Sequence, residues 1–97
     1  MKIRYTRRAN AQLNEIHTYI ADHDPKAARA VLDWIRRSIG LLVHFPYIYR
    51  RIGVEEIRVM PIRRYPYLVF YSVDQGAQEV LILRIRHSSQ DPDKHLG

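Results

Sequence analysis

Two segments near the C-terminal end of the chain, Tyr67 to Val73 and Val80 to Ile85, are apolar at nearly every position. The gap between them, Asp74 to Gln78, is short and contains Asp and Gly, which is typical of a hairpin loop. Because successive residues are apolar, both faces of these strands should be covered. The pattern therefore predicts an antiparallel hairpin at the centre of a sheet.

The first residues of the chain predict a strand followed by a helix. Lys2 to Thr6 alternates charged and apolar residues, which is typical of a short strand. Thr6 has the side chain of a helix N-cap, so the helix should begin at Arg7. Apolar residues then recur at helical spacing along one face, at Ala9, Leu13, Ile16 and Ile20.

A second helix should follow after a break at Asp22 to Pro25. Asp24 is a good N-cap, and Pro25 is a good first helical residue. We expect this helix to run to about Val43, although Gly40 weakens its last turn. The connection is short, so the two helices should pack as an antiparallel pair. The apolar face of the second helix consists of Ala28, Val31, Ile35, Ile39 and Leu42.

The stretch Phe45 to Gly53 is aromatic and basic, and it is predicted to be a loop or a ragged edge strand. We interpret its tyrosines as closing a small core, with stacking on nucleic-acid bases as the alternative. Glu55 to Ile62 should form the strand that leads into the hairpin. Pro61 cannot donate to a sheet ladder, so we expect an edge or a bulge there.

The predicted order, β-α-α-β-β-β, indicates an α+β fold in which the N-terminal helix pair covers one face of a small antiparallel sheet. Residues 1–97 should form a single domain, with 90–97 as a flexible tail. The second face of the sheet would be partly bare although its strands look apolar on both sides, so a partner should cover it. The core between the layers is expected to include Leu13, Ile16, Ile20, Ile35, Ile39, Val69 and Leu83.

The charge of the chain changes what kind of partner is expected. The net charge is +6, and Arg supplies all but three of the 16 basic residues. An acidic partner is therefore expected, and Arg suits bidentate binding of phosphate or carboxylate; the alternative is a charge that only keeps the protein soluble. The chain contains no Cys and no apolar run of about 18 residues, so we expect a cytoplasmic protein without disulfides or membrane contact. His17, His23 and His44 lack metal-ligand spacing, and neither a metal nor another cofactor is expected.

Basic residues flank the predicted hairpin at both of its free ends. Arg63 and Arg64 precede its first strand, and Arg84, Arg86 and His87 lie toward the end of its second. In an antiparallel pair the start of one strand lies beside the end of the other, so Arg63, Arg64, Arg86 and His87 should gather at one end of the sheet. The plainer interpretation of the arginines is a solvated sheet edge, and that of His87 is a side chain hydrogen-bonded to a neighbouring loop.

The order of elements, with RYPYLVFYSVD (residues 64–74) followed by EVLILRIRHSSQDP (residues 79–92), resembles the ParE/RelE toxin superfamily of bacterial type II toxin–antitoxin modules. The similarity covers essentially the whole chain and is strongest from Gly53 to Pro92. The resemblance implies a toxin that a cognate antitoxin, ParD-like or related, neutralises by wrapping its C-terminal segment around it. It further implies that target or antitoxin contacts come from Arg63, Arg64, Tyr65, Tyr67, Arg84, Arg86 and His87.

The superfamily contains two activities, and the sequence is closer to one of them. ParE-like members poison DNA gyrase without a known catalytic residue, whereas RelE-like members cleave mRNA on the ribosome. Several RelE-like nucleases carry an Arg where this chain has Tyr67, so the resemblance favours a ParE-like gyrase inhibitor that is not an enzyme. The alternative is a RelE-like endonuclease, with His87 as acid or base and with Arg63, Arg64 and Arg86 on the phosphate. A plain nucleic-acid-binding domain has no helix-turn-helix or aromatic RNA motif to support it.

Overall fold

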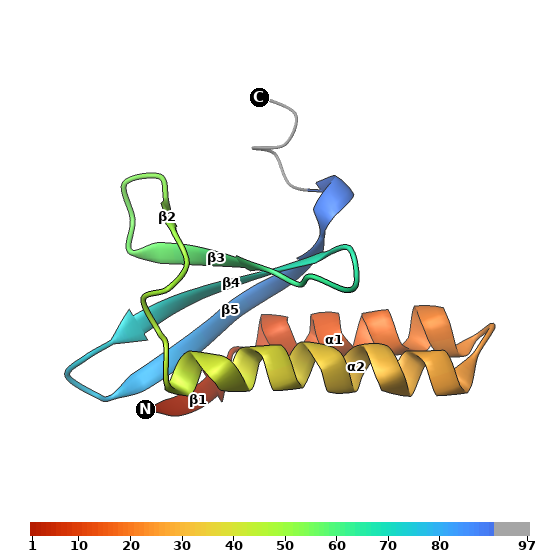
Figure 1. The fold of residues 1–97 in the computed structure, drawn as a ribbon. Helices are drawn as coiled ribbons and strands as arrows, with labels where there is room; N and C mark the ends of the chain where they lie inside the picture. The colour runs from red at the N-terminus through yellow and green to blue at the C-terminus, as the bar shows by residue number, and fades with distance from the viewer. Residues whose placement is uncertain (91–97) are drawn as a thin grey trace.

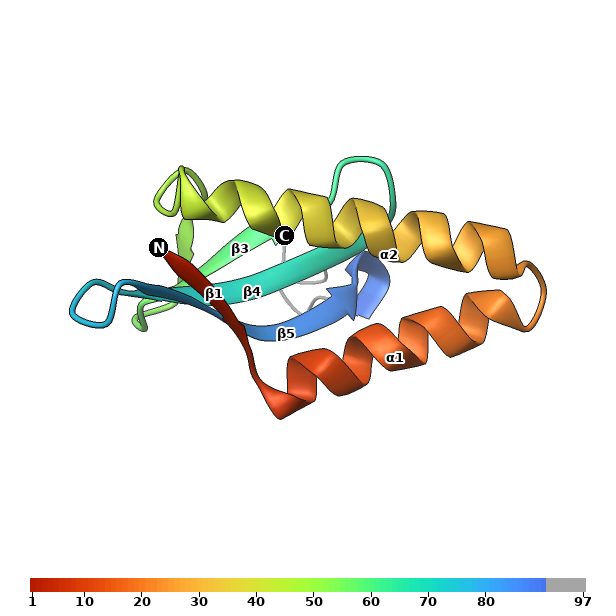
Figure 2. The same ribbon diagram turned by 90° about the horizontal axis from the view of Figure 1, so that it is seen from below.

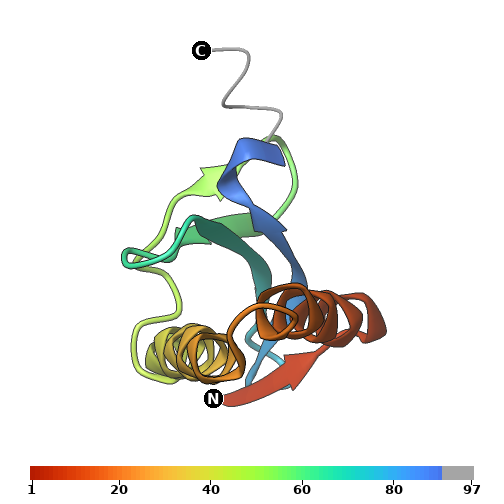
Figure 3. The same cartoon turned by 90° about the vertical axis from the view of Figure 1, so that its right-hand side faces the viewer.

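A helical hairpin lies against one face of a five-stranded sheet in the computed structural model, which describes residues 1–90 (Figures 1 and 3). The predicted α+β class and the order of the predicted elements are confirmed. The expected flexible tail, 90–97, lies outside the described residues except for Gln90. The elements are β1 (Lys2–Tyr5), α1 (Arg7–Ala21), α2 (Pro25–Gly40), the 3₁₀ turn η1 (Leu41–Val43), β2 (Arg51–Ile52), β3 (Ile57–Pro61), β4 (Tyr67–Asp74), β5 (Glu79–His87) and the 3₁₀ turn η2 (Ser88–Gln90).

The sheet has the order β1-β5-β4-β3-β2 and differs from the predicted sheet in two respects. It is mixed rather than antiparallel, because β1 pairs with β5 in parallel. It also contains the two-residue strand β2 at one edge, within the stretch expected to be a loop or a ragged edge strand. Since β2 pairs with β3 only at Ile57 and Arg58, Pro61 lies where β3 is an edge, as expected.

The helices begin at the predicted caps. The Thr6 hydroxyl accepts a hydrogen bond from the backbone N–H of Ala9 at 3.0 Å, and the Asp24 carboxylate accepts one from Ala27 at 3.1 Å. The Thr6 hydroxyl also donates to the carbonyl of Leu83 at 2.8 Å, which fastens the start of α1 to β5. The second helix ends at Gly40, three residues before the predicted end, and η1 continues it in a tighter turn.

Both faces of β4 are covered, as predicted from its continuous apolar sequence. Residues 68–71 are all buried. Val69 and Tyr71 belong to the core that includes the helices, whereas Leu68 and Phe70 form a smaller cluster with Val59 on the opposite face. On that opposite face the Arg84 guanidinium lies 4.4 Å from the centre of the Phe70 ring. The face expected to be partly bare is thus covered in part by the chain itself.

The prediction that Leu83 belongs to the core is wrong. Leu83 is only half-buried and does not belong to the core between helices and sheet. The register of β4 and β5 shifts between Phe70, which faces Arg84, and Tyr71, which faces Ile82, so Leu83 is the extra residue of a β-bulge. Ile16 and Ile20 are half-buried at the margin of the core, while Leu13, Ile35, Ile39 and Val69 are buried as predicted.

The helical hairpin is displaced along the sheet, so that it projects past one end of the sheet. Figure 1 shows the turn between α1 and α2 projecting well past the β3–β4 turn, and Figure 2 shows α1 alongside β5. The C-terminal half of α1 therefore extends past the end of β5. This geometry leaves room for a hollow between the two layers.

Candidate binding site

The end of the sheet that was predicted to gather basic residues is formed by the start of β4 and the end of β5. Tyr67 faces His87 across these two strands, and the backbone N–H of Ser88 donates to the carbonyl of Pro66 at 2.7 Å. The β3–β4 turn, which carries Arg63 and Arg64, immediately precedes Tyr67. The predicted placement of the chain segments is therefore confirmed, because the β3–β4 turn, the start of β4 and the end of β5 lie at one end of the sheet.

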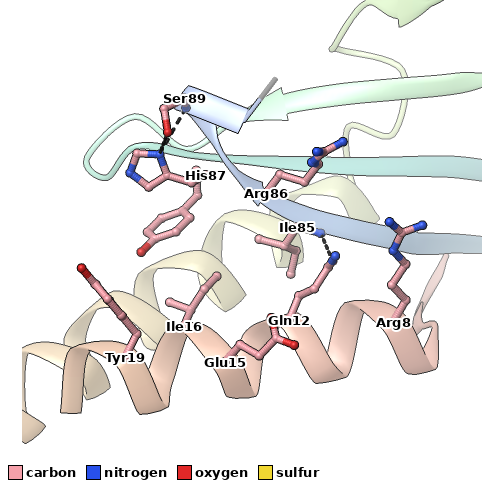
Figure 4. Close-up of a pocket in the computed structure, with 10 residues that line it drawn as sticks. Arg8, Gln12, Glu15, Ile16, Tyr19, Ile85, Arg86, His87 and Ser89 are labelled. Carbon is pink, nitrogen blue, oxygen red and sulfur yellow. Dashed lines mark hydrogen bonds between the residues drawn. The ribbon is translucent and has the colours of Figure 1, made fainter. Parts of the chain in front are cut away.

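A hollow of about 650 Å³ lies between this end of the sheet and α1. Figure 4 shows side chains from α1 on one wall and the end of β5 with His87 on the other. The hollow is open to solvent and combines apolar, aromatic and charged groups, as binding sites for other molecules do. Its lining consists of Arg8, Gln12, Glu15, Ile16, Tyr19, Tyr67, Ile85, Arg86, His87 and Ser89.

The ring of His87 is fixed by two neighbours. The Tyr67 ring lies edge-on to it, with 5.5 Å between the ring centres and 82° between the ring planes. Nδ1 of His87 accepts the backbone N–H of Ser89 at 3.1 Å and lies 2.7 Å from the Ser89 hydroxyl. Because a backbone N–H can only donate, Nδ1 is an acceptor here, which places the ring proton on Nε2. The interpretation of His87 as a strand-end side chain bonded to a neighbouring segment therefore fits the structure.

The opposite wall is fixed to the sheet by Gln12. Its side-chain oxygen accepts the backbone N–H of Ile85 at 2.6 Å, just after the β-bulge. Within the hollow, partial burial raises the pKa of the Tyr67 phenol, and the nearby Tyr19 raises it further. The hydroxyl of Tyr67 therefore remains protonated at neutral pH and can donate a hydrogen bond to a ligand.

The predicted arginines do not converge on this hollow. Arg63 and Arg64 are exposed in the β3–β4 turn, and the Arg64 guanidinium lies 5.2 Å from the centre of the Trp34 ring on α2. Arg84 lies on the opposite face of the sheet, over Phe70. Arg86 borders the hollow, but its guanidinium points away from the His87 ring in Figure 4.

Tyr65 and Tyr67, the two tyrosines predicted to contact a target or an antitoxin, lie in different parts of the structure. Tyr67 lines the hollow, whereas Tyr65 is half-buried and packs against the core. Of the residues predicted from the sequence, the structure therefore brings Tyr67 and His87 together in the hollow, with Arg86 at its border.

The contribution of α1 to the hollow was not predicted from the sequence. Arg8, Gln12, Glu15 and Tyr19 are spaced by three or four residues, so they share one helical face beside the apolar face of α1. This spacing is visible in the sequence. What the sequence does not show is that the hairpin extends past the sheet and leaves that face opposite His87.

The described residues provide little for other kinds of site. No three His, Asp or Glu side chains of residues 1–90 are grouped as a metal site would require. None of the helices formed by these residues has the length and apolar composition needed to cross a bilayer.

Comparison with known proteins places the fold among bacterial toxins. The structure is similar to the isolated RelE toxin of E. coli, with a TM-score of 0.70 at 11% identity over 98% of this chain and 92% of that one. It is also similar to a chain of a chromosomal ParDE toxin–antitoxin system from P. aeruginosa, with a TM-score of 0.77 at 27% identity over 90% and 95% of the two chains.

The sequence assigns the chain to one branch of these toxins. Residues 3–92 match the family described as the ParE toxin of the type II toxin–antitoxin system parDE, and the chain belongs to this family. A relative in Sinorhizobium fredii strain NGR234, the candidate toxin Y4kP, is 32% identical over 89 residues, which cover 92% of this chain and 90% of the relative. The predicted membership of the ParE/RelE superfamily, with the ParE-like branch favoured, is confirmed.

Proposed function

We propose that this ParE-family toxin acts in the cytoplasm by binding DNA gyrase and arresting it, and that a cognate antitoxin neutralises it. The action rests on a binding surface rather than on a bond-making side chain. The observation that supports this proposal is the dispersal of the arginines. Arg64 lies over Trp34 on α2 and Arg84 lies over Phe70 on the far face of the sheet, so the guanidinium groups do not meet around one phosphate.

The state of His87 supports the same proposal. A general base needs a ring nitrogen with a lone pair that can accept a proton from the substrate. Nδ1 of His87 already accepts from Ser89, and Nε2 carries the proton in this tautomer. In this tautomer neither ring nitrogen has a lone pair available to take a proton from a substrate.

The test uses the full-length chain and two purified targets. A gyrase poison should cause cleaved plasmid DNA to accumulate when it is mixed with DNA gyrase and ATP. The same preparation should leave mRNA on programmed ribosomes intact. Cleavage of ribosome-bound mRNA with no effect on gyrase would contradict the proposal and identify the chain as a nuclease.

The alternative function is a ribosome-dependent endoribonuclease, and one observation favours it. Arg8, Arg86, His87 and Tyr67 all line or border one hollow, and such residue types can position a phosphate and move a proton. Loss of Nδ1 bonding to Ser89 would be required before His87 could act as a base through that atom. The paired gyrase and ribosome assays separate the two functions.

The antitoxin is proposed to fill the hollow between α1 and the end of β5. Homologous toxins have been solved as complexes with their own antitoxins, as in the RelBE complex of E. coli. The walls offer Ile16 and the exposed ring of Tyr19 to apolar groups and Arg8 to carboxylates. An amphipathic, net acidic segment fits this combination of surfaces and the +6 charge of the chain.

A further inference from the structure

The loop that joins α2 to β2 exposes an unusual number of large apolar side chains. Leu41, Phe45, Tyr47 and Ile48 are 60, 58, 46 and 65% exposed. Outside this loop, the other exposed large apolar side chains of residues 1–90 are those of Tyr19 and Val54. Single exposed apolar residues need no explanation, but a group of them in eight residues indicates an interaction surface.

Three of these side chains follow one another along consecutive turns of the backbone. The N–H of Phe45 donates to the carbonyl of Leu41 at 3.1 Å, and the N–H of Ile48 donates to the carbonyl of Phe45 at 3.4 Å. Residues four apart in a helical turn lie on the same side, and the second turn brings Ile48 back toward Phe45. We call Leu41, Phe45 and Ile48, the exposed apolar side chains of these turns, the apolar knob.

The backbone under the apolar knob is fixed to the sheet. The hydroxyl of the buried Tyr71 on β4 donates to the carbonyl of Pro46 at 2.8 Å. The Arg58 guanidinium on β3 donates to the carbonyl of Tyr49 at 2.6 Å and lies 5.0 Å from the centre of the Tyr47 ring. A surface that is already ordered loses little conformational entropy on binding, so the knob is suited to binding another protein.

The charges beside the apolar knob indicate the chemistry of its partner. Arg37 lies one helical turn before Leu41, and Arg50 follows Ile48 by two residues; both are exposed. The ion pairs formed within residues 1–90 are Arg4–Glu79 and Arg51–Glu56, so neither arginine is neutralised by a carboxylate there. A fitting partner has an apolar pocket rimmed by carboxylates. A second copy of this chain fits poorly, because it carries the same arginines and a net charge of +6.

We propose that the apolar knob is the surface through which this toxin binds its target protein, in an apolar pocket rimmed by carboxylates. The inference rests on the proposed function, in which the toxin acts by binding. A cluster of exposed apolar side chains on an ordered backbone fits a pocket in a folded protein, whereas a flexible antitoxin segment buries surface by lying in a hollow such as that beside α1. The antitoxin then neutralises the toxin by steric hindrance of a much larger target, without covering the knob.

The test compares the triple variant Leu41→Ser/Phe45→Ser/Ile48→Ser with Val54→Ser. Val54 is 103% exposed in the β2–β3 turn, so its replacement makes a matched polar change outside the knob. Affinity for purified DNA gyrase and for the cognate antitoxin is measured by surface plasmon resonance, and growth arrest is measured at matched soluble expression. We expect the triple variant to bind gyrase at least about tenfold more weakly and to lose growth arrest. Its antitoxin affinity should stay within about threefold of the wild type, and Val54→Ser should change neither.

A second variant tests the charge separately and changes no packed side chain. Arg37→Glu reverses an exposed charge beside the knob and should slow association with gyrase, with a smaller effect at high salt. Equal growth arrest by the triple variant and the wild type would overturn the inference. So would an equal loss of antitoxin affinity, or a dimer of the wild-type chain that the triple variant loses.

The two proposals fail in different ways. If the wild type arrests growth without binding gyrase while the triple variant does not arrest growth, the gyrase proposal is wrong and the knob inference stands. If the wild type and the triple variant poison gyrase equally, the knob inference is wrong and the gyrase proposal stands.

Discussion

At the scale of single residues, Tyr71 connects the core to the surface loop. Its ring is fully buried between the helices and the sheet, while its hydroxyl donates to the carbonyl of Pro46. Burial raises the pKa of the Tyr71 phenol to about 12, against a smaller lowering by the Arg58 charge. The neutral hydroxyl is thus favoured in the folded protein, and it holds the loop that carries the apolar knob.

Replacement of Tyr71 by Phe should lower the free energy of unfolding by about 1–2 kcal/mol at neutral pH, because the carbonyl of Pro46 loses its donor. The pKa of the hydroxyl is higher in the folded state than in the unfolded state. Its contribution is therefore complete below pH 10 and is lost as the pH rises toward about 12. Urea unfolding of both proteins from pH 7 to 11.5 measures the difference. A difference that stays constant or grows with pH would contradict this account.

At the scale of elements, Thr6 joins α1 to β5. Its hydroxyl caps α1 through the N–H of Ala9 and donates to the carbonyl of Leu83 in the β-bulge. Asp24 caps α2 in the same way but is exposed, and its carboxylate bonds only within its own helix start. The first cap therefore fastens a helix to the sheet, whereas the second acts locally.

Thr6→Ala should cost about 1–2 kcal/mol of unfolding free energy, at the upper end of values for helix caps, because it also leaves the carbonyl of Leu83 without that donor. Asp24→Ala should cost about 0.5–1 kcal/mol, as an exposed cap does. Thr6→Ser keeps the hydroxyl and serves as the control. Urea midpoints measure all three variants, and equal costs at Thr6 and Asp24 would show that the bond to Leu83 contributes nothing.

Local signals predicted most of these elements. Thr6, Asp24 and Pro25 mark helix starts through chemistry that involves only their neighbours in the sequence, and the apolar spacing of α1 and α2 identifies their buried faces. The bulge at Leu83 and the parallel pairing of β1 depend on how distant strands register, which no local pattern encodes.

The candidate site was predictable only in part for the same reason. The antiparallel hairpin implied that the residues before β4 and those at the end of β5, including His87, lie at one end of the sheet, and they do. The sequence does not show where the guanidinium groups of Arg64 and Arg84 lie. Arg64 lies over the Trp34 ring and Arg84 over the Phe70 ring. Those contacts join separate elements or opposite strands, so they appear only once the fold is assembled.

At the scale of the whole molecule, the chain presents two separate surfaces. The hollow between α1 and the end of β5 is concave and lined by aromatic rings and arginines, and we assign it to the antitoxin. The apolar knob lies exposed on the loop after α2, and we assign it to the target. Under the proposed function, the action of the toxin depends on binding, and His87 has no part in bond breaking.

The most direct test of a binding mechanism compares wild-type toxin with His87→Ala. The measured quantity is the cleaved plasmid DNA that accumulates with purified gyrase. His87 packs on Tyr67 and bonds to Ser89. A binding mechanism assigns it no proton transfer and therefore predicts nearly equal cleavage by the two proteins. The loss of a general acid or base typically reduces a rate by about 10²–10⁴-fold. Wild-type protein that leaves gyrase unaffected but cleaves ribosome-bound mRNA, with that cleavage abolished in His87→Ala, would contradict the account.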